Sequence, residues 1–152
     1  MLVQLLRYEV PSWGVGEIWL EEGTLVYHEL PRAGAPAEGG HPLVERLQAY
    51  FRGAPARFGD VMIDLSWATA FQRAVAEALR RVPYGEVVTY GELAALAGHP
   101  NAQRAAGSFC AANRFAIVLP CHRVVAASGL GSYGSLGAAY KRRLLALEGV
   151  EL

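Results

Sequence analysis

The hydrophobic pattern changes along the chain from a strand-like period to a helical one, and this change limits the possible folds. Residues 2–10 alternate loosely, and GEIWLEEGTLVYHEL predicts a β-hairpin with strands near 16–20 and 24–30 and a turn at EEG. A helix is expected over PLVERLQAYFRG, and FGDVMIDLSW is interpreted as one more strand. Residues 1–65 are therefore predicted to form a small α/β lobe.

The second part of the chain, residues 66–152, is predicted to be mostly helical. SWATAFQRAVAEALRRVP carries one apolar stripe, and AAYKRRLLALEG predicts a basic amphipathic closing helix. Thr89 followed by Glu92 fits a capping box, which predicts a helix beginning near Tyr90. A second helix is expected to begin at Pro100. Two short helices around a glycine turn indicate a helix-turn-helix, and the fold class is α+β.

Composition excludes several classes of protein. In 152 residues, 53% are hydrophobic and 18% charged, which is typical of a globular chain and not of a disordered one. No apolar run approaches the roughly 20 residues of a membrane helix, and MLVQLLRYEVPSWG has neither a basic leader nor a cleavage site. Two cysteines do not make a disulfide framework. The chain is predicted to be cytoplasmic, with reduced thiols and no membrane association.

The net charge of zero conceals an asymmetry between the two parts. Residues 1–65 hold five Arg against nine Asp plus Glu, a net charge of −4. Residues 66–152 hold nine Lys plus Arg against five Glu, a net charge of +4. Such a distribution would steer a polyanion toward the second part, although chance can also produce it in a short chain.

The stretch AIVLPCHRVVAASG places a thiol, an imidazole and a guanidinium between two apolar runs. A lone cysteine is most often a buried structural residue. A nearby His or positive charge instead lowers the pKa of a thiol and makes it a nucleophile, and His122 and Arg123 could act in this way on Cys121. Pro120 indicates a turn, where neighbouring side chains need not point to opposite faces. Cys110 is interpreted as a small apolar residue of its helix.

The expected second helix is made almost entirely of small residues, with Arg104 as its one long charged side chain near the middle. Such a helix packs tightly against another helix, or it lies close to something large and smooth such as a nucleic-acid groove. The histidines lack partner spacing for a metal, so no metal site is expected. GLGSYGSLG is interpreted as a flexible loop and not as a phosphate cradle.

The motif PCHRV, residues 120–124, resembles the active-site motif of the methylated-DNA–protein-cysteine methyltransferases, also called O6-alkylguanine-DNA alkyltransferases. The resemblance extends from about Phe71 to Gly149, through FQRAVAEALRRVPYGEVVTYGELAALAGHPNAQRAAGSFCAANR and YKRRLLALEG. It implies a helical, winged-helix-like lobe that binds DNA and transfers the alkyl group. The first lobe matches in pattern only, and the resemblance implies that it has an RNase-H-like fold.

The resemblance also implies the catalytic residues. Cys121 would accept the alkyl group from O6 of guanine, or from O4 of thymine, and keep it as a thioether. His122 would take the thiol proton through a water, with Glu148 orienting the imidazole. Asn113 would hold the turn that carries the cysteine. Tyr90 would rotate the phosphate of the damaged nucleotide and donate a proton to the leaving base.

Further positions follow from the same resemblance. The partner would be double-stranded DNA containing O6-alkylguanine, bound through its minor groove by a cytoplasmic, nucleoid-associated monomer, with no cofactor. Arg104 would fill the gap left by the extruded base. The DNA-binding positions are Thr89, Tyr90, Arg104, Ala105, Gly107, Ser108, Arg114 and Arg123, and those of the base pocket are Tyr133, Ser135 and Lys141.

Three features of the sequence depart from the family pattern. Arg114 stands where proline is usual, Tyr133 falls one place off the usual register, and the first lobe lacks the cysteines of the zinc site found in some relatives.

Three other functions are possible alternatives. A non-catalytic, alkyltransferase-like lesion binder would share the architecture but lack the cysteine. A transcription regulator would need long polar side chains on the second helix. A cysteine hydrolase would need a distant His–Asn pair, which does not stand out.

Overall fold

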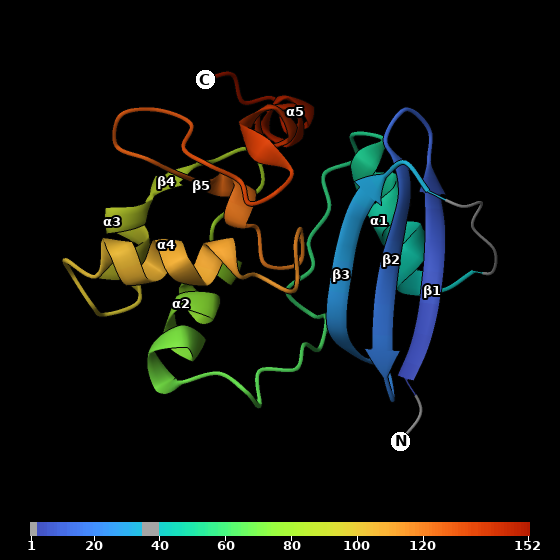
Figure 1. The fold of residues 1–152 in the computed structure, drawn as a ribbon, viewed down its shortest axis with the longest axis horizontal. Helices are drawn as coiled ribbons and strands as arrows, with labels where there is room; N and C mark the ends of the chain where they lie inside the picture. The colour runs from blue at the N-terminus through green and yellow to red at the C-terminus, as the bar shows by residue number, and fades with distance from the viewer. Residues whose placement is uncertain (1–2, 35–39) are drawn as a thin grey trace. The chain divides into compact units, whose positions relative to one another are not determined.

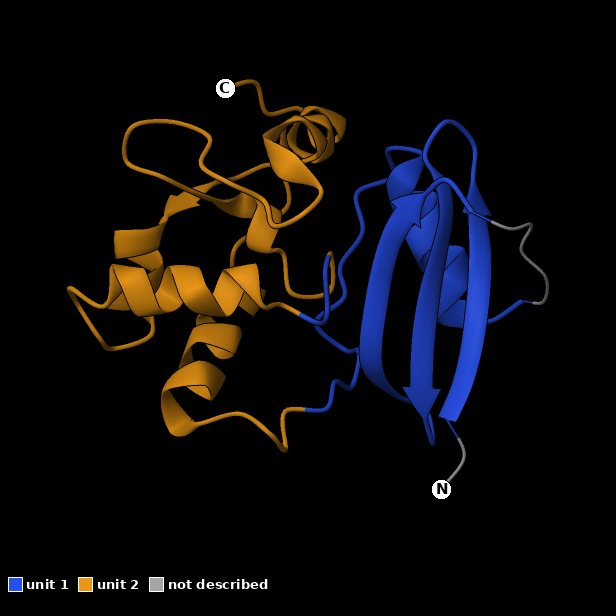
Figure 2. Ribbon diagram, viewed as in Figure 1, with its two compact units in different colours: residues 1–64, 114–116 blue, residues 65–113, 117–152 orange. Residues whose placement is uncertain are grey.

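The structure is a computed structural model that describes residues 3–34 and 40–152, and it contains both helices and strands (Figure 1). The chain divides into two compact units (Figure 2). Unit 1 comprises residues 1–64 and 114–116, and unit 2 comprises residues 65–113 and 117–152. The short segment 114–116 thus groups with unit 1, although the sequence division places it in the second lobe. That the two lobes are separate domains stays a prediction.

Unit 1 contains a three-stranded antiparallel sheet and one helix. The strands β1 (Val3–Val10), β2 (Gly14–Glu21) and β3 (Thr24–Arg32) lie in the order β1-β2-β3, and α1 (Pro42–Phe51) lies behind the sheet in Figure 1. Alternate strand side chains are buried, as expected for a sheet with one covered face. The predicted hairpin is confirmed, and φ values of 50° at Glu22 and 83° at Gly23 give it a two-residue turn of the left-handed kind.

The strand predicted at FGDVMIDLSW is wrong. Only one isolated bridge forms there, between Leu25 and Ile63, with hydrogen bonds from Leu25 N to Met62 O (2.8 Å) and from Asp64 N to Leu25 O (2.9 Å). Turns at 59–60 and 66–67 leave too few extended residues between them for a ladder.

A buried histidine ties the segment 114–116 to the sheet within unit 1. The His28 backbone N–H donates to Arg114 O (2.8 Å), and its ring Nδ1 lies 2.6 Å from Ala116 O. The Tyr8 hydroxyl lies 2.5 Å from Nε2 of the same ring. A carbonyl can only accept, so Nδ1 carries the proton and Nε2 accepts from Tyr8. A neutral imidazole therefore satisfies both contacts.

This histidine makes the stability of the protein depend on pH. Burial lowers the pKa of His28 from 6.5 to about 4, against the opposing effect of its bond to Ala116. Between these values the unfolded chain binds a proton that the folded chain does not, so the free energy of unfolding falls as the pH falls. From pH 7 to pH 5 this group alone should lower it by roughly 2 kcal/mol.

The variant His28→Asn keeps a donor near Ala116 but does not titrate. Urea unfolding at pH 7 and pH 5 should therefore show a smaller acid-induced decrease in the variant than in the wild type. His99→Asn, at an exposed side chain, is the control and should behave as the wild type does. An equal decrease in His28→Asn and in the wild type would contradict this assignment.

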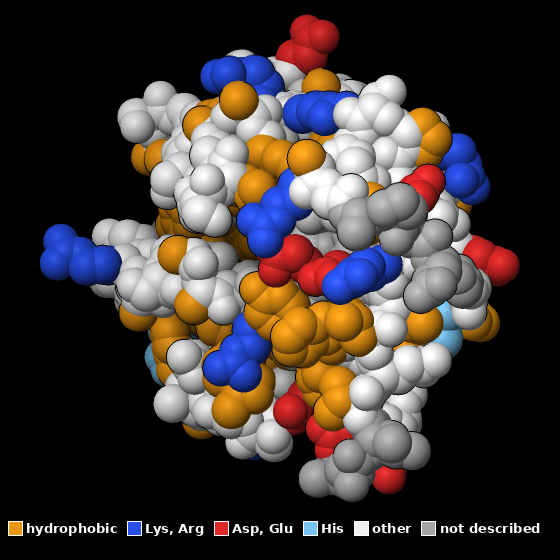
Figure 3. All heavy atoms as spheres, turned by 45° about the vertical axis from the view of Figure 1, so that its right-hand side comes forward, with side chains coloured by type: hydrophobic (Ala, Val, Ile, Leu, Met, Phe, Trp, Pro, Cys, Tyr) orange, Lys and Arg blue, Asp and Glu red, His pale blue; other side chains and the backbone are white. Residues whose placement is uncertain are grey.

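The face of the sheet opposite its buried side chains keeps an apolar row. Leu5, Trp19 and Tyr27 lie opposite one another on the three strands, and the rings of Trp19 and Tyr27 are 5.6 Å apart. Leu5 and Trp19 are 45% and 41% exposed. Hydrophobic side chains gather on the face that Figure 3 brings forward. Cross-strand pairs of this kind stabilise the sheet even without a second covering layer.

Unit 2 is mostly helical, and a predicted side-chain cap marks the beginning of one of its helices. It contains α2 (Ala70–Arg80), α3 (Tyr90–Leu96), α4 (Gln103–Ala111) and α5 (Gly137–Leu147). The predicted capping box is confirmed: Glu92 N donates to Thr89 Oγ1 (3.1 Å), and Thr89 N donates to Glu92 Oε1 (2.9 Å). No helix in the described ranges is long and apolar enough to cross a membrane.

The predicted start of the second helix at Pro100 is wrong, because α4 begins at Gln103. Asn101 adopts a left-handed φ of 72°, and Ala102 N donates to His99 O (3.1 Å). These two features place Pro100 inside the turn between α3 and α4. The proline rule for a first helical position was applied one turn too early.

A short parallel pairing joins two distant parts of unit 2. The strand β4 (Val88–Thr89) pairs with β5 (Val124–Val125), so Val88 lies opposite Val124 and Thr89 opposite Val125. The strand β4 leads directly into α3, and β5 follows the 3-10 turn η1 (Cys121–Arg123). The pairing therefore brings the beginning of α3 next to the turn that carries the cysteine.

Candidate functional site

The turn that carries Cys121 is held by the side chain of Asn113, just beyond the end of α4. The Asn113 amide donates to Leu119 O (2.9 Å) and to Cys121 Sγ (3.1 Å). Ile117, which precedes the turn, is buried and has a φ of 72°, a conformation that β-branched residues rarely adopt. Such strain persists only where the surrounding structure over-determines the backbone. The position of the thiol is therefore imposed by contacts with residues outside the motif.

The Cys121 thiol is buried, with 5% of the residue exposed. Burial raises its pKa, while the Asn113 and Tyr133 side chains and the positive charge of Lys141 act in the opposite direction. The thiol is therefore protonated at rest, but three neighbouring groups favour its thiolate. A reaction at this sulfur needs a base that removes the proton when a substrate arrives.

His122, which follows the cysteine in sequence, forms a buried pair with the distant Glu148. His122 Nε2 is 2.5 Å from Glu148 Oε2, and both side chains are fully buried. Burial lowers the pKa of His122, against the raising effect of Glu148. For Glu148, burial would raise the pKa, but hydrogen bonds from His122, Arg123 and the Gly85 N–H outweigh it and lower the pKa to about 2. The carboxylate is ionised and accepts the Nε2 proton of a neutral imidazole.

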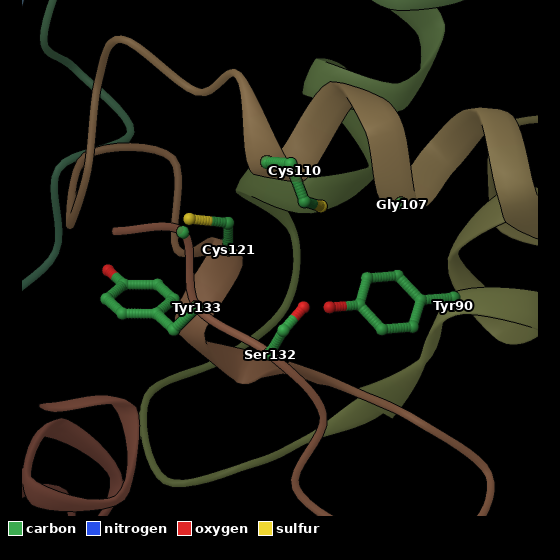
Figure 4. Close-up of a pocket in the computed structure, with 8 residues that line it drawn as sticks. Tyr90, Gly107, Cys110, Cys121, Ser132 and Tyr133 are labelled. Atoms are coloured by element: carbon green, nitrogen blue, oxygen red, sulfur yellow. The ribbon is translucent and has the colours of Figure 1, made fainter. Parts of the chain in front are cut away.

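A pocket opens over the thiol (Figure 4). It is lined by Tyr90, Gly107, Cys110, Ala111, Cys121, Ser132, Tyr133 and Gly134. Tyr90 and Ser132 point their hydroxyl groups toward one another in this view. Burial, and then the nearby thiols, raise the pKa of Tyr90 to about 12, so its phenol stays protonated and remains a hydrogen-bond donor. The pocket therefore combines a nucleophile with a proton donor.

A second, more open hollow shares two residues with this pocket. It is lined by Tyr90, Asn101, Gln103, Arg104 and Gly107, so Tyr90 and Gly107 belong to both. A Cβ on Gly107 would already meet the Tyr90 ring at 3.7 Å. Tyr90 and Gly107 therefore form the boundary that the pocket over the thiol and the open hollow beside α4 have in common.

The predicted DNA-binding positions differ in how exposed they are. Arg104, Ala105 and Ser108 are exposed on α4, with Gly107 partly buried beside them. Thr89 uses its hydroxyl in the capping box, and Arg114 is exposed within unit 1. Arg123 differs from all of these because it is 7% exposed and hydrogen-bonded to Glu148.

The predicted base-pocket residues are placed unevenly. Tyr133 lines the pocket, whereas Ser135 and Lys141 are not among the described residues that line it. Lys141 is fully buried and donates from Nζ to Val124 O (2.5 Å) and to Ser132 O (3.3 Å). Its ammonium thus ties the loop before α5 to β5 and lies 5.7 Å from the centre of the Tyr90 ring.

Four residues that line the pocket were not predicted from the sequence, namely Cys110, Ala111, Ser132 and Gly134. Cys110 was interpreted as structural, but it follows Gly107 by three residues on α4 and so shares its face. That spacing was the available signal. Ser132 lies in an irregular loop, where no periodicity indicates which side chains point inward. No cluster of metal-ligating side chains occurs within residues 3–34 and 40–152.

A buried thiol backed by a His–Glu pair, opening toward a helix of small residues, defines a protein that uses a cysteine as an acceptor or nucleophile. The family model described as "6-O-methylguanine DNA methyltransferase, DNA binding domain" matches residues 70–150. The methylated-DNA–protein-cysteine methyltransferase of Methanopyrus kandleri is 46% identical over 125 residues, covering 79% of this chain and 92% of its own. That of Mycolicibacterium paratuberculosis is 49% identical over 121 residues, covering 79% and 68%.

Solved structures agree with these sequence matches. The Mycobacterium tuberculosis O6-methylguanine methyltransferase aligns with a TM-score of 0.82 at 35% identity, covering 97% of this chain and 93% of that one. The structure of Mycobacterium tuberculosis OGT in complex with DNA aligns with a TM-score of 0.81 at 36% identity, covering 95% and 92%. The chain belongs to the methylated-DNA–protein-cysteine methyltransferase family.

Proposed function

We propose that this chain repairs DNA by transferring an alkyl group from O6 of guanine to the sulfur of Cys121. The observation that carries this proposal is the Cys121 thiol itself, buried in a pocket with Asn113 donating to its sulfur at 3.1 Å. Membership of the family supports the type of reaction, and the buried thiol in the pocket supports Cys121 as the acceptor. O4-alkylthymine, with the same alkyl–oxygen bond, is a further candidate substrate.

The reaction follows from the groups around the sulfur. His122 takes the Cys121 proton through a water, and Glu148 stabilises the imidazolium that forms. The thiolate attacks the alkyl carbon, a carbon–sulfur bond forms, and the carbon–O6 bond breaks with its electron pair moving to guanine. Tyr90 donates its proton to the departing guanine, which leaves neutral, and the proton that left Cys121 replaces it through His122 and water. The thioether is stable, so each protein molecule repairs one lesion and needs no cofactor.

The DNA interface is assigned to α3 and α4, which we infer form a helix-turn-helix. The exposed small residues of α4 allow close approach to a minor groove, and unit 2 contains most of the positively charged second part of the chain. The target carbon is stacked inside a duplex, so the nucleotide must be extruded. To reach the thiol, the extruded base would have to enter beside Tyr90 and Gly107, the two residues that line both the open hollow and the pocket.

The remaining expectations from the resemblance are part of the same proposal. They are an RNase-H-like first lobe, a winged-helix-like second lobe, and a cytoplasmic protein that acts on DNA as a monomer. The mixed content of helices and strands in each unit is compatible with both lobe assignments.

An intact mass tests the proposal directly. The protein is incubated with a duplex that carries one O6-methylguanine, and digestion then locates any modified peptide. A gain of one methyl group on Cys121 is the expected result. No gain, together with tight binding to the same duplex, would indicate a lesion binder that does not react.

Arg104 should affect the rate of alkyl transfer from duplex DNA much more than the rate of transfer from the free base. Its exposed side chain on the open hollow is placed to fill the gap left by an extruded nucleotide. Arg104→Ala should slow transfer from duplex DNA by roughly 10- to 100-fold, because extrusion costs a few kcal/mol that the side chain helps to offset. Transfer from free O6-methylguanine should change less than about twofold on the same reasoning.

The control for this experiment is Arg142→Ala, which removes an exposed arginine from α5. It should slow neither reaction appreciably. Equal losses for Arg104→Ala on duplex and free base would rule out the gap-filling role.

A further inference from the structure

Arg123 directs its guanidinium into unit 2 and toward Glu148. Its Nε donates to Glu148 Oε1 (2.9 Å), and its Nη2 donates to Glu148 Oε2 (3.2 Å). Its Nη1 donates to Val82 O (2.8 Å), and the guanidinium lies 5.7 Å from the centre of the Tyr84 ring. The residue is 7% exposed. A side chain held in this way is poorly placed to bind DNA, which is the role that the resemblance implies.

The two oxygens of Glu148 are shared among three residues. Oε1 accepts from Arg123 Nε and from the Gly85 N–H (3.0 Å), and Oε2 accepts from His122 Nε2 and from Arg123 Nη2. A two-point contact with a guanidinium fixes the plane of a carboxylate as well as its position. Arg123 therefore determines the direction from which His122 meets Oε2.

The location of Glu148 explains why a fixed cation is needed there. Glu148 caps the C-terminal end of α5, where the helix carbonyls carry partial negative charge. Val82 O, the other acceptor of Arg123, lies just beyond the end of α2. A buried carboxylate between two such helix ends must be neutralised. Within residues 3–34 and 40–152, Glu148 forms ion pairs with Arg123 and His122, so without Arg123 a protonated His122 would be the cation that remains to pair with it.

We propose that Arg123 is a positioning residue for alkyl transfer: its guanidinium holds the Glu148 carboxylate against His122 Nε2 and keeps the imidazole neutral, so that the imidazole can take the Cys121 proton. The proposal rests on the proposed function, because it concerns the base of that reaction. It replaces the role of Arg123 in DNA binding by a role inside the site. The arginine never touches the substrate and acts only through Glu148.

The charged groups around His122 give the direction of the expected pH effect. They are Lys141 on α5, Glu148 just after the end of α5, and Arg123 on the 3-10 turn. Burial lowers the pKa of His122, Glu148 raises it, and the charges of Arg123 and Lys141 lower it further. Removing the positive charge of Arg123 should therefore raise the pKa of His122. The neutral base would then be lost at a higher pH than in the wild type.

Two variants and one control test the proposal. Arg123→Met removes the charge at similar length, and Arg123→Lys keeps a charge but loses the two-point contact. Arg142→Ala, at an exposed arginine, is the control. Transfer is followed in a single turnover with saturating protein between pH 5.5 and 9, and the Kd for the same duplex is measured separately.

For Arg123→Met we expect a transfer rate roughly 10- to 100-fold lower, with the acid limb of the rate profile shifted to higher pH. Arg123→Lys should recover part of the rate, and Kd should change less than about twofold in both variants. A tenfold weaker binding of the duplex, with an unchanged transfer rate within the bound complex, would overturn the proposal and would indicate that Arg123 binds DNA. A wild-type pH profile in Arg123→Met would overturn it as well.

A second readout does not depend on alkyl transfer. The imidazole nitrogen shifts of His122, followed by NMR across the same pH range, report its protonation directly. In Arg123→Met, which removes the positive charge, the midpoint should move to higher pH than in the wild type, whereas in Arg123→Lys, which keeps a charge, it should stay near the wild-type value. An unmoved midpoint in Arg123→Met would refute the role of Arg123. If the wild type transferred no alkyl group at all, the proposed function would fail, and this titration would still decide whether Arg123 controls His122.

Discussion

Replacing Cys121 with alanine is expected to abolish alkyl transfer completely while the protein still binds duplex DNA. The sulfur is the atom that forms the new bond, and alanine offers no nucleophile in its place. Binding should persist because the surfaces assigned to DNA lie on α3 and α4 and do not include this thiol. Intact mass after incubation with an O6-methylguanine duplex measures the transfer, and fluorescence anisotropy measures the binding.

The chain provides a matched control for this experiment in its other cysteine. Cys110 lines the same pocket, so Cys110→Ala also removes a thiol from its wall. Burial and the nearby Cys121 raise the pKa of the Cys110 thiol, whereas only Cys121 receives a hydrogen bond from Asn113. Cys110→Ala should therefore still gain one methyl group. If Cys121→Ala gained a methyl group and Cys110→Ala did not, the acceptor would be Cys110 and not Cys121.

Replacing Glu148 with alanine should cause the largest loss of stability among the site variants. It removes the acceptor of His122 Nε2, of the Arg123 guanidinium and of the Gly85 N–H. Deleting one partner of a buried ion pair leaves an uncompensated charge and typically costs about 3–5 kcal/mol. For a chain of this size that corresponds to a fall in Tm of roughly 10 °C. Thermal and urea unfolding measure both quantities, and transfer should also slow because the base loses its orientation.

The pH dependence of the unfolding free energy distinguishes the contribution of the Glu148 charge from that of its packing. The pKa of Glu148 is lowered from 4.5 to about 2, so its contribution is present above pH 4.5 and is lost as the pH falls toward 2. Glu148→Gln preserves the shape but does not titrate. It should therefore lack this part of the acid-induced decrease in unfolding free energy. Glu151→Ala, at an exposed carboxylate three residues further along, is the control and should unfold as the wild type does.

Signals between neighbouring residues in sequence predicted local structure well. The capping box of Thr89 and Glu92 and the hairpin turn before β3 form as expected, because each depends on groups within three residues of one another. Where a distant contact or a competing turn decided the outcome, local reasoning failed. Pro100 lies in the turn before α4 and not at the start of that helix. The stretch around Ile63 forms one isolated bridge instead of a strand.

The sequence by itself determined the family, through PCHRV and the helices around it, and with the family the reaction. It also indicated that Cys121 and His122 are the reactive pair. Only the tertiary structure decided what the charge of Arg123 does. This residue meets Glu148 across 25 residues of chain and is buried, although the resemblance implied that it binds DNA. Cys110 likewise enters the pocket wall because of the way α4 packs. The physical reason is that capping and turns depend on near neighbours in the chain, whereas burial and ion pairing depend on which distant elements the fold brings together.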